Sequence, residues 1–424
     1  MSGPRRPLVP LGACICALAV ALGLPAAAAD AQPSYEERHQ ALVDAVRRGE
    51  KKQLTFGSLT TIKAYIVDLR RNGGKYDGYA ERMKRLVSQL LTAAEEGRDE
   101  LAEKRGIFWR GYESRYSFYP QLYSIYVPKE YDGKKPLPLV VSLHGGHSNF
   151  NVWLAMNLGN ILKPPQYREN FRTEFRAVRQ SNTIIVAPDG LGEIRWRWSG
   201  EQDVLDVIED AKANYNIDPD KIVLSGLSNG GIGSYTIGLK HASKFSAVLP
   251  LAGVVDWLIH HEATGRHRPS EKTVLENESA ITYAENAQNT YLHFFHGTRD
   301  SGFSVEQARS LAALLERLKI PFVYKEFSNL GHDLTHVLWR TMLVDAIAKK
   351  QTRQKNGAHV RVATASPRSI EQQWLSLDER LDHTRPAHLD ANVVDGARIE
   401  MTTENAERVT IRFEECPVSS PVSI

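Results

Sequence analysis

Apolar positions between residues 35 and 103 recur every three or four residues, which is the spacing of amphipathic helices. They form three groups: Leu42, Val43 and Val46; Ile62, Tyr65, Ile66 and Leu69; and Met83, Leu86, Val87, Leu90 and Leu91. The run Asn72-Gly73-Gly74 interrupts the pattern and predicts a break between two helices. We therefore expect residues 32–106 to form a helical N-terminal extension.

From residue 107 the pattern changes to short apolar runs that alternate with helical segments. The apolar runs predict strands at residues 121–127, 139–143, 183–187, 221–224, 246–251, 291–295 and 322–327. The helical segments are residues 201–213, 230–241, 305–318 and 333–349. This alternation predicts an α/β domain over residues 107–350, with a mostly parallel sheet covered by helices on both faces.

Beyond residue 350 the segments become short and alternate polar with apolar residues. Residues 351–357 are polar and have the composition of a linker. Alternating segments follow at residues 359–364, 373–377, 388–393, 398–402 and 408–413. Turn residues such as Asp395-Gly396 separate them, as in antiparallel hairpins. The pattern predicts a small β-rich domain over residues 358–415 and a tail over residues 416–424.

The first 31 residues have the pattern of an export signal. Arg5 and Arg6 precede an apolar run at residues 11–24, and small residues then offer Ala-x-Ala cleavage after Ala29 or Ala31. The apolar run is shorter than the roughly 20 residues that a membrane span needs. We therefore expect a cleaved signal peptide, no membrane span in the mature protein, and a location in the periplasm or outside the cell. A twin-arginine signal is compatible with the same residues.

The cysteines agree with this interpretation. Leu11-Gly12-Ala13-Cys14 resembles a lipoprotein cleavage box, although it lies before most of the apolar run. Cys14 and Cys16 would leave with the signal, so Cys416 would remain alone and could not form an internal disulfide. The mature protein would then depend on its core for stability.

The bulk composition excludes several classes of function. Hydrophobic residues make up 42% and charged residues 24% of the chain, as in ordinary globular proteins. The net charge is +3 with both signs intermixed, so nothing points to a nucleic-acid partner. Neither a glycine-rich phosphate loop nor the spacing of Cys and His metal ligands is found. We therefore expect no cofactor and no metal.

The most specific motif is Gly226-Leu227-Ser228-Asn229-Gly230, which directly follows the predicted strand at residues 221–224 and precedes a predicted helix. A strand that runs through Gly-x-Ser-x-Gly into a helix is a nucleophile elbow, whose serine hydroxyl stands clear of the sheet. Glycines on either side let the strand and the helix pass close together. We predict Ser228 as the nucleophile.

A serine hydroxyl needs a base within hydrogen-bond reach, and the base needs an orienting carboxylate. Asp300 follows the predicted strand at residues 291–295, and His332 follows the one at residues 322–327. Catalytic groups in open parallel sheets gather at the carboxyl ends of the strands. The order Ser, Asp, His along the chain is that of α/β-hydrolases. We therefore predict a triad of Ser228, Asp300 and His332.

Other acidic and histidine residues remain as alternatives. Asp256 lies after the strand that follows Ser228, where some hydrolases keep their acid, whereas Asp189 precedes the nucleophile. His336 lies one helical turn beyond His332, and three further histidines precede Asp300 and so break the chain order. These three are His260, His261 and His267.

The tetrahedral intermediate of such a reaction needs hydrogen-bond donors for its oxyanion. One donor is the backbone N–H of Asn229, which follows the nucleophile. The second is expected from the loop Leu143-His144-Gly145-Gly146-His147, where we favour the N–H of Gly146 over that of Gly145. A plain tight turn is the alternative explanation of these glycines.

Six motifs occur together in order along the chain: His144-Gly145-Gly146, Ala187-Pro188-Asp189-Gly190, Tyr215-Asn216-Ile217-Asp218-Pro219-Asp220, Gly226-Leu227-Ser228-Asn229-Gly230-Gly231, His296-Gly297 with Asp300, and Gly331-His332-Asp333. As a set they resemble the bacterial prolyl-oligopeptidase-like branch of the α/β-hydrolases, which includes feruloyl-esterase-like enzymes and peptidases. The resemblance covers residues 107–349 and implies an α/β-hydrolase fold with serine-hydrolase chemistry. The chain departs from the family after the acid, where Ser301-Gly302-Phe303-Ser304-Val305 replaces a frequent Val-Pro pair.

We predict that aromatic residues near the site contact the substrate. Trp153 follows the oxyanion loop, and Trp196 and Trp198 follow a strand end. Packing under loops explains these residues equally well. Residues 256–288 form an insertion before the strand of the acid.

These observations favour an exported serine hydrolase that cleaves a small-molecule or polymer-linked carboxylic ester through an acyl-enzyme. A serine peptidase acting on short peptides with the same triad is the alternative, and a binding protein on an inactive hydrolase scaffold is the third. Esters need less protonation of the leaving group, and no carboxylate that would recognise a substrate amine is evident.

Overall fold

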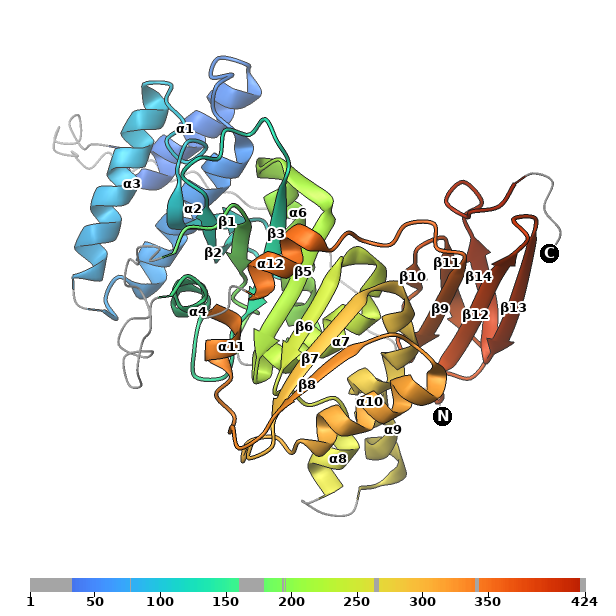
Figure 1. Cartoon of the computed structure of the whole chain (residues 1–424). Helices are drawn as coiled ribbons and strands as arrows, with labels where there is room; N and C mark the ends of the chain where they lie inside the picture. The colour runs from blue at the N-terminus through green and yellow to red at the C-terminus, as the bar shows by residue number, and fades with distance from the viewer. Residues whose placement is uncertain are drawn as a thin grey trace, which may run out of the picture.

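The computed structural model describes residues 33–76, 78–159, 179–192, 194, 196–262, 267–339 and 343–419 (Figure 1). The predicted signal peptide lies outside these residues. Within them, no helix combines the length and the apolar character that crossing a membrane requires.

The centre of the molecule is one sheet of eight strands in the order β1-β2-β4-β3-β5-β6-β7-β8. Its strands are β1 (Gly106–Tyr112), β2 (Gln121–Val127), β3 (Leu137–Leu143), β4 (Ile184–Ala187), β5 (Ile217–Leu227), β6 (Ala247–Leu251), β7 (Tyr291–Gly297) and β8 (Val323–Phe327). Strands β3 to β8 run parallel, whereas β1 and β2 form an antiparallel hairpin and β2 pairs antiparallel with β4. This is the α/β-hydrolase fold, as predicted.

Helices cover both faces of the sheet because successive residues of each buried strand point to opposite sides. Val223 of β5 belongs to one hydrophobic layer and Leu224 to the other. The first layer packs under α4 (Phe150–Asn157), α11 (Thr335–Trp339), α12 (Leu343–Lys350) and the N-terminal helices. The second packs under α6 (Ser199–Asn214), α7 (Asn229–Lys240), α10 (Glu306–Leu318) and the 3-10 helix η2 (Ala280–Asn289).

The predicted insertion before Asp300 contains α8 (Trp257–Glu262), α9 (Pro269–Glu278) and η2. A short 3-10 helix, η1 (Ala242–Lys244), precedes β6.

The prediction of one helix over residues 333–349 is wrong at its start. Asp333 accepts the backbone N–H of Thr335 at 3.0 Å, so the helix begins at Thr335. Strand β1 was not predicted, because its sequence does not alternate regularly between polar and apolar residues.

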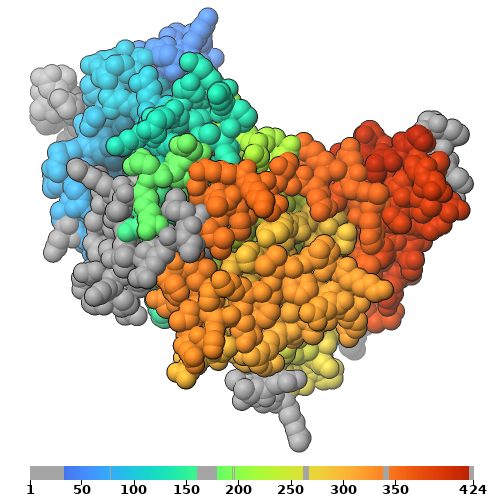
Figure 2. All heavy atoms as spheres, viewed as in Figure 1, coloured from blue at the N-terminus to red at the C-terminus, as the bar shows by residue number. Residues whose placement is uncertain are grey.

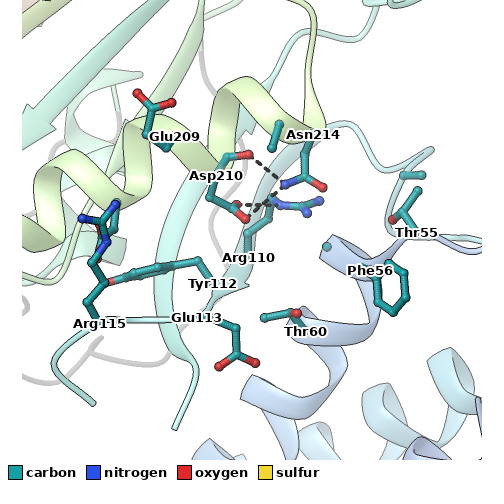
Figure 3. A pocket seen from close by; sticks show the side chains of 14 residues that line it. Thr55, Phe56, Thr60, Arg110, Tyr112, Glu113, Arg115, Glu209, Asp210 and Asn214 are labelled. Carbon is teal, nitrogen blue, oxygen red and sulfur yellow. Dashed lines mark hydrogen bonds and ion pairs between the residues drawn. The ribbon is translucent and has the colours of Figure 1, made fainter. Parts of the chain in front are cut away.

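The N-terminal extension consists of α1 (Tyr35–Arg47), α2 (Phe56–Asn72) and α3 (Tyr79–Glu95), which pack beside β1. The hydroxyl of Tyr65 on α2 donates to the Trp109 carbonyl at 2.5 Å. Next to this contact, α2, β1 and α6 line an open pocket of about 580 Å³ (Figure 3). The Arg110 guanidinium in its wall is 1% exposed and lies 3.6 Å from Asp210. Neither Ser228 nor His332 lines this pocket.

The C-terminal residues form two three-stranded antiparallel sheets that enclose their own core around Trp374. One sheet contains β10 (Ile370–Gln372), β11 (Leu375–Arg380) and β14 (Ala406–Ile411), and the other contains β13 (Arg398–Glu404), β12 (Ala387–Val394) and β9 (His359–Thr364). Asn286 of η2 joins β9 to the α/β part by hydrogen bonds to both backbone groups of Ala363. Figure 2 shows these strands and the N-terminal helices at opposite ends of the molecule.

Candidate active site

Ser228 lies at the turn between β5 and α7 in a strained conformation. Its φ of 62° and ψ of −120° are rare for a residue with a side chain. Such strain persists only where the surrounding structure imposes it, and it is common at active sites. The Ser228 N–H donates to the Leu251 carbonyl of the next strand at 3.1 Å, which fixes the turn at the carboxyl edge of the sheet.

Close packing explains why the turn requires glycine. A Cβ on Gly226 would lie 2.5 Å from the Gly230 carbonyl oxygen and 2.7 Å from that of Leu143. A Cβ on Gly230 would overlap the Leu143 oxygen itself and lie 3.0 Å from the His144 oxygen. Backbone atoms of a central strand cannot move aside as flexible side chains can, so these sites exclude any larger residue.

We expect the Gly230→Ala substitution to lower the free energy of unfolding by about 3 kcal/mol or more, because the added methyl group must displace β3 or α7. Urea denaturation of the purified protein measures this change. The matched control is Gly74→Ala, since a Cβ there meets nothing within 4 Å. Equal stability of the two variants would show that the elbow is not tightly packed.

Asp300 and His332 are joined by hydrogen bonds at the ends of β7 and β8. The His332 Nδ1 lies 2.9 Å from Oδ2 and 3.0 Å from Oδ1 of Asp300. A carboxylate only accepts hydrogen bonds, so Nδ1 donates to Asp300, and in the neutral imidazole the lone pair is on Nε2. The N–H groups of Gly302 and Phe303 donate to Oδ1 at 2.8 and 2.9 Å. The loop therefore folds around the carboxylate and fixes its orientation.

A second histidine contacts the same carboxylate. His296 Nε2 lies 2.9 Å from the Phe303 carbonyl oxygen and 3.3 Å from Asp300 Oδ2. Burial by itself raises the pKa of the Asp300 carboxyl, but hydrogen bonds from His296 and His332 outweigh it and hold this pKa well below its usual range. The contact was not predicted, because the sequence places His296 in a motif without showing where its ring points.

Backbone hydrogen bonds hold the loops that carry Ser228, Asp300 and His332 side by side. Ala252, which follows β6, donates to the Phe295 carbonyl at 2.9 Å, and Arg299 donates to the Leu330 carbonyl at 2.8 Å. The His332 ring is 33% exposed and bonds to Asp300, and no hydrogen bond joins it to the Ser228 hydroxyl within the described chain. Catalytic hydrogen bonds are often long without substrate and tighten when it binds.

The predicted oxyanion loop lies against the elbow. A Cβ on Gly145 would be 3.4 Å from the Ser228 Cβ, and one on Gly146 would be 3.0 Å from the Asn229 side-chain amide. The side chain of His144 ties this loop to the loop after β4, because its Nε2 lies 3.1 Å from the Asp189 carbonyl oxygen. The loop that carries Gly145 and Gly146 therefore packs against Ser228 and Asn229.

The structure corrects part of the predicted substrate contacts. Trp153 is only 4% exposed, and its indole N–H donates to the Ser142 hydroxyl at 2.8 Å inside the core. Trp196 is 3% exposed and donates to the His144 carbonyl at 3.1 Å, so it supports the oxyanion loop. Trp198 is 63% exposed and is the one of the three that is open to a ligand.

The alternative acids and bases contact residues other than Ser228, Asp300 and His332. Asp256 accepts the backbone N–H of Leu258 at 2.8 Å and so begins α8. His260 packs its ring on Phe303 at 5.5 Å, and His336 lies on α11 with its ring 6.5 Å from Phe327. His261 and His267 flank residues 263–266, which lie outside the described residues.

Asp203 on α6 anchors the loop that follows β4. It is 1% exposed, accepts the Gly190 N–H at 2.5 Å and bonds to the Tyr112 hydroxyl. Burial raises the pKa of this carboxyl to about 7, against the effect of the Tyr112 hydrogen bond and with a contribution from Asp189. Since the folded-state pKa exceeds the unfolded value of about 3.9, the protonated group stabilises the fold at low pH, and this contribution is lost as pH rises through 7.

From pH 5 to pH 8 the free energy of unfolding of the wild type should fall by about 3 kcal/mol more than that of the Asp203→Asn variant. Urea unfolding at both pH values gives the difference, and Asp395→Asn at an exposed turn is the control. Parallel pH curves for the wild type and Asp203→Asn would show that Asp203 is ionised throughout this range.

Comparison with known proteins supports the resemblance noted in the sequence. The profile of the prolyl oligopeptidase family matches residues 191–350. A probable feruloyl esterase C of Aspergillus terreus is 32% identical over 136 residues, or 31% of this chain and 46% of that protein. A bifunctional acetylxylan esterase/xylanase of Neocallimastix patriciarum is 30% identical over 107 residues, 24% of this chain and 16% of that protein.

Dipeptidyl-peptidase 5 of Porphyromonas gingivalis is 22% identical over 217 residues, or 45% of this chain and 29% of that protein. The match to each of these curated relatives spans less than half of the relative's length. The predicted resemblance is nevertheless confirmed: residues 191–350 resemble the prolyl oligopeptidase family, and part of the chain is similar in sequence to feruloyl esterases.

Proposed function

We propose that this protein is a serine hydrolase that cleaves carboxylic esters through an acyl-enzyme on Ser228. The observation that carries the proposal is the ordered pair of Asp300 and His332, at 2.9 Å, on the same edge of the sheet as the strained Ser228 turn. A buried carboxylate that orients a partly exposed imidazole supplies the base and its partner, which a serine hydroxyl needs to act as a nucleophile.

In the first half of the reaction, His332 Nε2 accepts the proton of the Ser228 hydroxyl as its oxygen attacks the ester carbonyl. The N–H groups of Asn229 and Gly146, or Gly145, donate to the oxyanion that forms. Collapse of the intermediate breaks the bond to the leaving alcohol, which takes the proton from His332. Water then attacks the acyl-enzyme by the same route and releases the acid.

Asp300 remains a carboxylate throughout these steps. Its lowered pKa keeps it ionised near neutral pH, so it stabilises the His332 imidazolium without taking its proton. The N–H groups of Gly302 and Phe303 hold Oδ1 of Asp300, and His296 contacts Oδ2, so the carboxylate keeps one orientation toward His332. No cofactor or metal enters the proposed steps.

The relatives include both esterases and a peptidase, so peptide cleavage is the second candidate. Esterase activity is favoured because the feruloyl and acetylxylan esterases match this chain at higher identity than the peptidase does. An alcohol leaving group also needs less protonation than an amine.

The test compares hydrolysis of p-nitrophenyl acetate and butyrate with that of aminoacyl p-nitroanilides by the purified protein. We expect kcat/KM for the esters to exceed that for the anilides by at least about tenfold. A preference for the anilides would replace the esterase proposal with the peptidase one. Activity on neither class would favour the binding protein.

We also propose that the protein is exported, on the basis of the charged, apolar and small-residue pattern in its first 31 residues. N-terminal sequencing of the protein recovered outside the cytoplasm should begin at Asp30 or Gln32. A chain that retains Met1 would contradict cleavage.

A further inference from the structure

Hydrogen bonds fix the carbonyl groups of two successive peptides in the oxyanion loop. The indole N–H of Trp196 donates to the His144 carbonyl at 3.1 Å. The Gly145 carbonyl accepts the Ser148 N–H at 3.4 Å and lies 3.0 Å from the His144 Nδ1. The C=O and N–H of a planar trans peptide point in opposite directions, so each fixed carbonyl also fixes the direction of the next N–H. These next N–H groups belong to Gly145 and Gly146, the predicted oxyanion donors.

Trp196 holds its position with a strained backbone. Its φ of 62° lies in the left-handed region, which is rare for a residue with so large a side chain. Close packing encloses its ring: a Cβ on Gly190 would lie 2.9 Å from the ring atom Cζ3, and one on Gly233 would lie 2.6 Å from Cγ. Strain of this kind persists only where surrounding contacts impose it, and it clusters at functional sites. The packing therefore fixes the indole N–H opposite the His144 carbonyl.

Asp203 of α6 extends this support to the loop after β4. Its carboxyl group accepts the N–H of Gly190, the residue on which the Trp196 ring packs, at 2.5 Å. The preceding carbonyl, that of Asp189, lies 3.1 Å from the His144 Nε2. The His144 and Trp196 rings meet edge to face, with their centroids 4.9 Å apart. The loop after β4 therefore contacts both the backbone and the ring of His144, so it determines how the oxyanion loop is oriented.

The elbow lies against the same two peptides. A Cβ on Gly145 would lie 3.4 Å from the Ser228 Cβ, and one on Gly146 would lie 3.0 Å from the Asn229 Nδ2. An oxyanion that forms on the carbon attached to Ser228 needs donors about 3 Å away. A misplacement of about 1 Å in such a group can cost about 100-fold in rate. The contacts that orient the two peptides therefore bear on the rate of the reaction.

We propose that Trp196 is a positioning residue of the oxyanion hole. Its indole N–H orients the peptide between His144 and Gly145, and its ring orients the His144 side chain that contacts the Gly145 carbonyl, so that both glycine N–H groups face the oxyanion. This role rests on the proposed serine-hydrolase function of Ser228. Without the indole N–H the substrate binds as before, but the oxyanion loses part of its stabilisation.

The Trp196→Phe substitution removes the indole N–H and keeps an aromatic ring in place. We expect kcat for p-nitrophenyl acetate to fall by about 10- to 100-fold, which is less than the roughly 10²- to 10³-fold loss that follows removal of a donor itself. KM should change little, because the effect is confined to the transition state. Urea denaturation shows whether the variant is folded.

Inhibition by trifluoroacetone separates this role from a general loss of structure. The Ser228 oxygen adds to the ketone carbon, its proton passes to His332, and the electron pair of the C=O bond stays on the oxygen as an oxyanion. The inhibition constant of Trp196→Phe should therefore rise by the same factor as kcat/KM falls. A partly unfolded preparation would lower kcat but leave this constant unchanged.

Two further variants isolate the contribution of the N–H group. Trp153→Phe removes another buried indole N–H, which donates to the Ser142 hydroxyl at 2.8 Å in the core, and it should leave kcat and the inhibition constant near the wild-type values. Trp196→His carries a nitrogen, Nε2, at the ring position of the indole nitrogen. It should bind trifluoroacetone more tightly than Trp196→Phe does, although it fills less space.

Three results would each overturn the positioning role: an unchanged inhibition constant in Trp196→Phe, an equal rise in Trp153→Phe, or no recovery in Trp196→His. In all three cases the wild type would still hydrolyse the ester, so the proposed function would stand. A wild type that neither hydrolyses p-nitrophenyl acetate nor binds trifluoroacetone would overturn the proposed function, and this inference with it.

Discussion

Replacing Ser228 with alanine should abolish ester hydrolysis, lowering kcat by a factor on the order of 10⁶. The serine oxygen is the group that forms the covalent bond to the acyl carbon, so its loss leaves only binding and oxyanion stabilisation. Steady-state kcat for p-nitrophenyl acetate measures the effect. The exposed serine in the loop after β7, Ser301, provides the control, since Ser301→Ala removes a hydroxyl without a predicted role.

Two outcomes of this experiment would contradict the account. A Ser228→Ala protein that keeps more than about a hundredth of wild-type activity would show that another group is the nucleophile. Equal losses for Ser228→Ala and Ser301→Ala would show that both changes disturb the loops rather than the chemistry.

Replacing Asp300 with asparagine should lower kcat about 10⁴-fold with little change in KM, because the fold and the substrate contacts remain. The asparagine amide can donate to His332 Nδ1, which favours the tautomer with the proton on Nε2. That tautomer cannot accept the serine proton. Loss of the carboxylate also removes the charge that stabilises the imidazolium.

The same experiment distinguishes Asp300 from Asp256, the alternative acid. Asp256→Asn should keep nearly full activity, since Asp256 accepts the Leu258 N–H at the start of α8. If Asp256→Asn lost activity and Asp300→Asn kept it, the roles of the two residues would be reversed.

The sequence predicted the α/β core because its signals are local. The run at residues 221–231 combines a β-branched strand, closely spaced glycines and a helix, and each of these features depends on neighbours in the chain. The strands before Asp300 and His332 are buried parallel strands, whose continuous apolar runs are visible without a structure. Their common edge then follows from the right-handed, parallel connections of such a sheet.

The errors concern contacts between residues that are far apart in the chain. Trp153 looks like a pocket residue from its position after the oxyanion loop, but its indole bonds to Ser142 of the adjacent strand and fills the core. His296 contacts Asp300 because the loop at residues 298–303 turns back over β7. The spacing of apolar residues shows which face of a helix or strand is buried. It does not show which side chain from a distant part of the chain packs against that face.

The aromatic rings of the β1–β2 hairpin loop were missed for a related reason. Tyr116, Phe118 and Tyr119 resemble core residues in composition, and only the structure shows that they are exposed. Their loop reaches α6 through Arg115, which lies 3.3 Å from Asp206, and this depends on the antiparallel pairing of β2 with β4. No local pattern in residues 113–120 carries this information.

The most direct test of the central claim is labelling of the purified protein with a fluorophosphonate, followed by peptide mapping. Such a probe phosphonylates a serine only where a neighbouring base has activated its hydroxyl. The account predicts one modified peptide carrying the label on Ser228, and loss of labelling in the His332→Ala protein. Label on a different serine, or an unmodified Ser228 in folded protein, would contradict it.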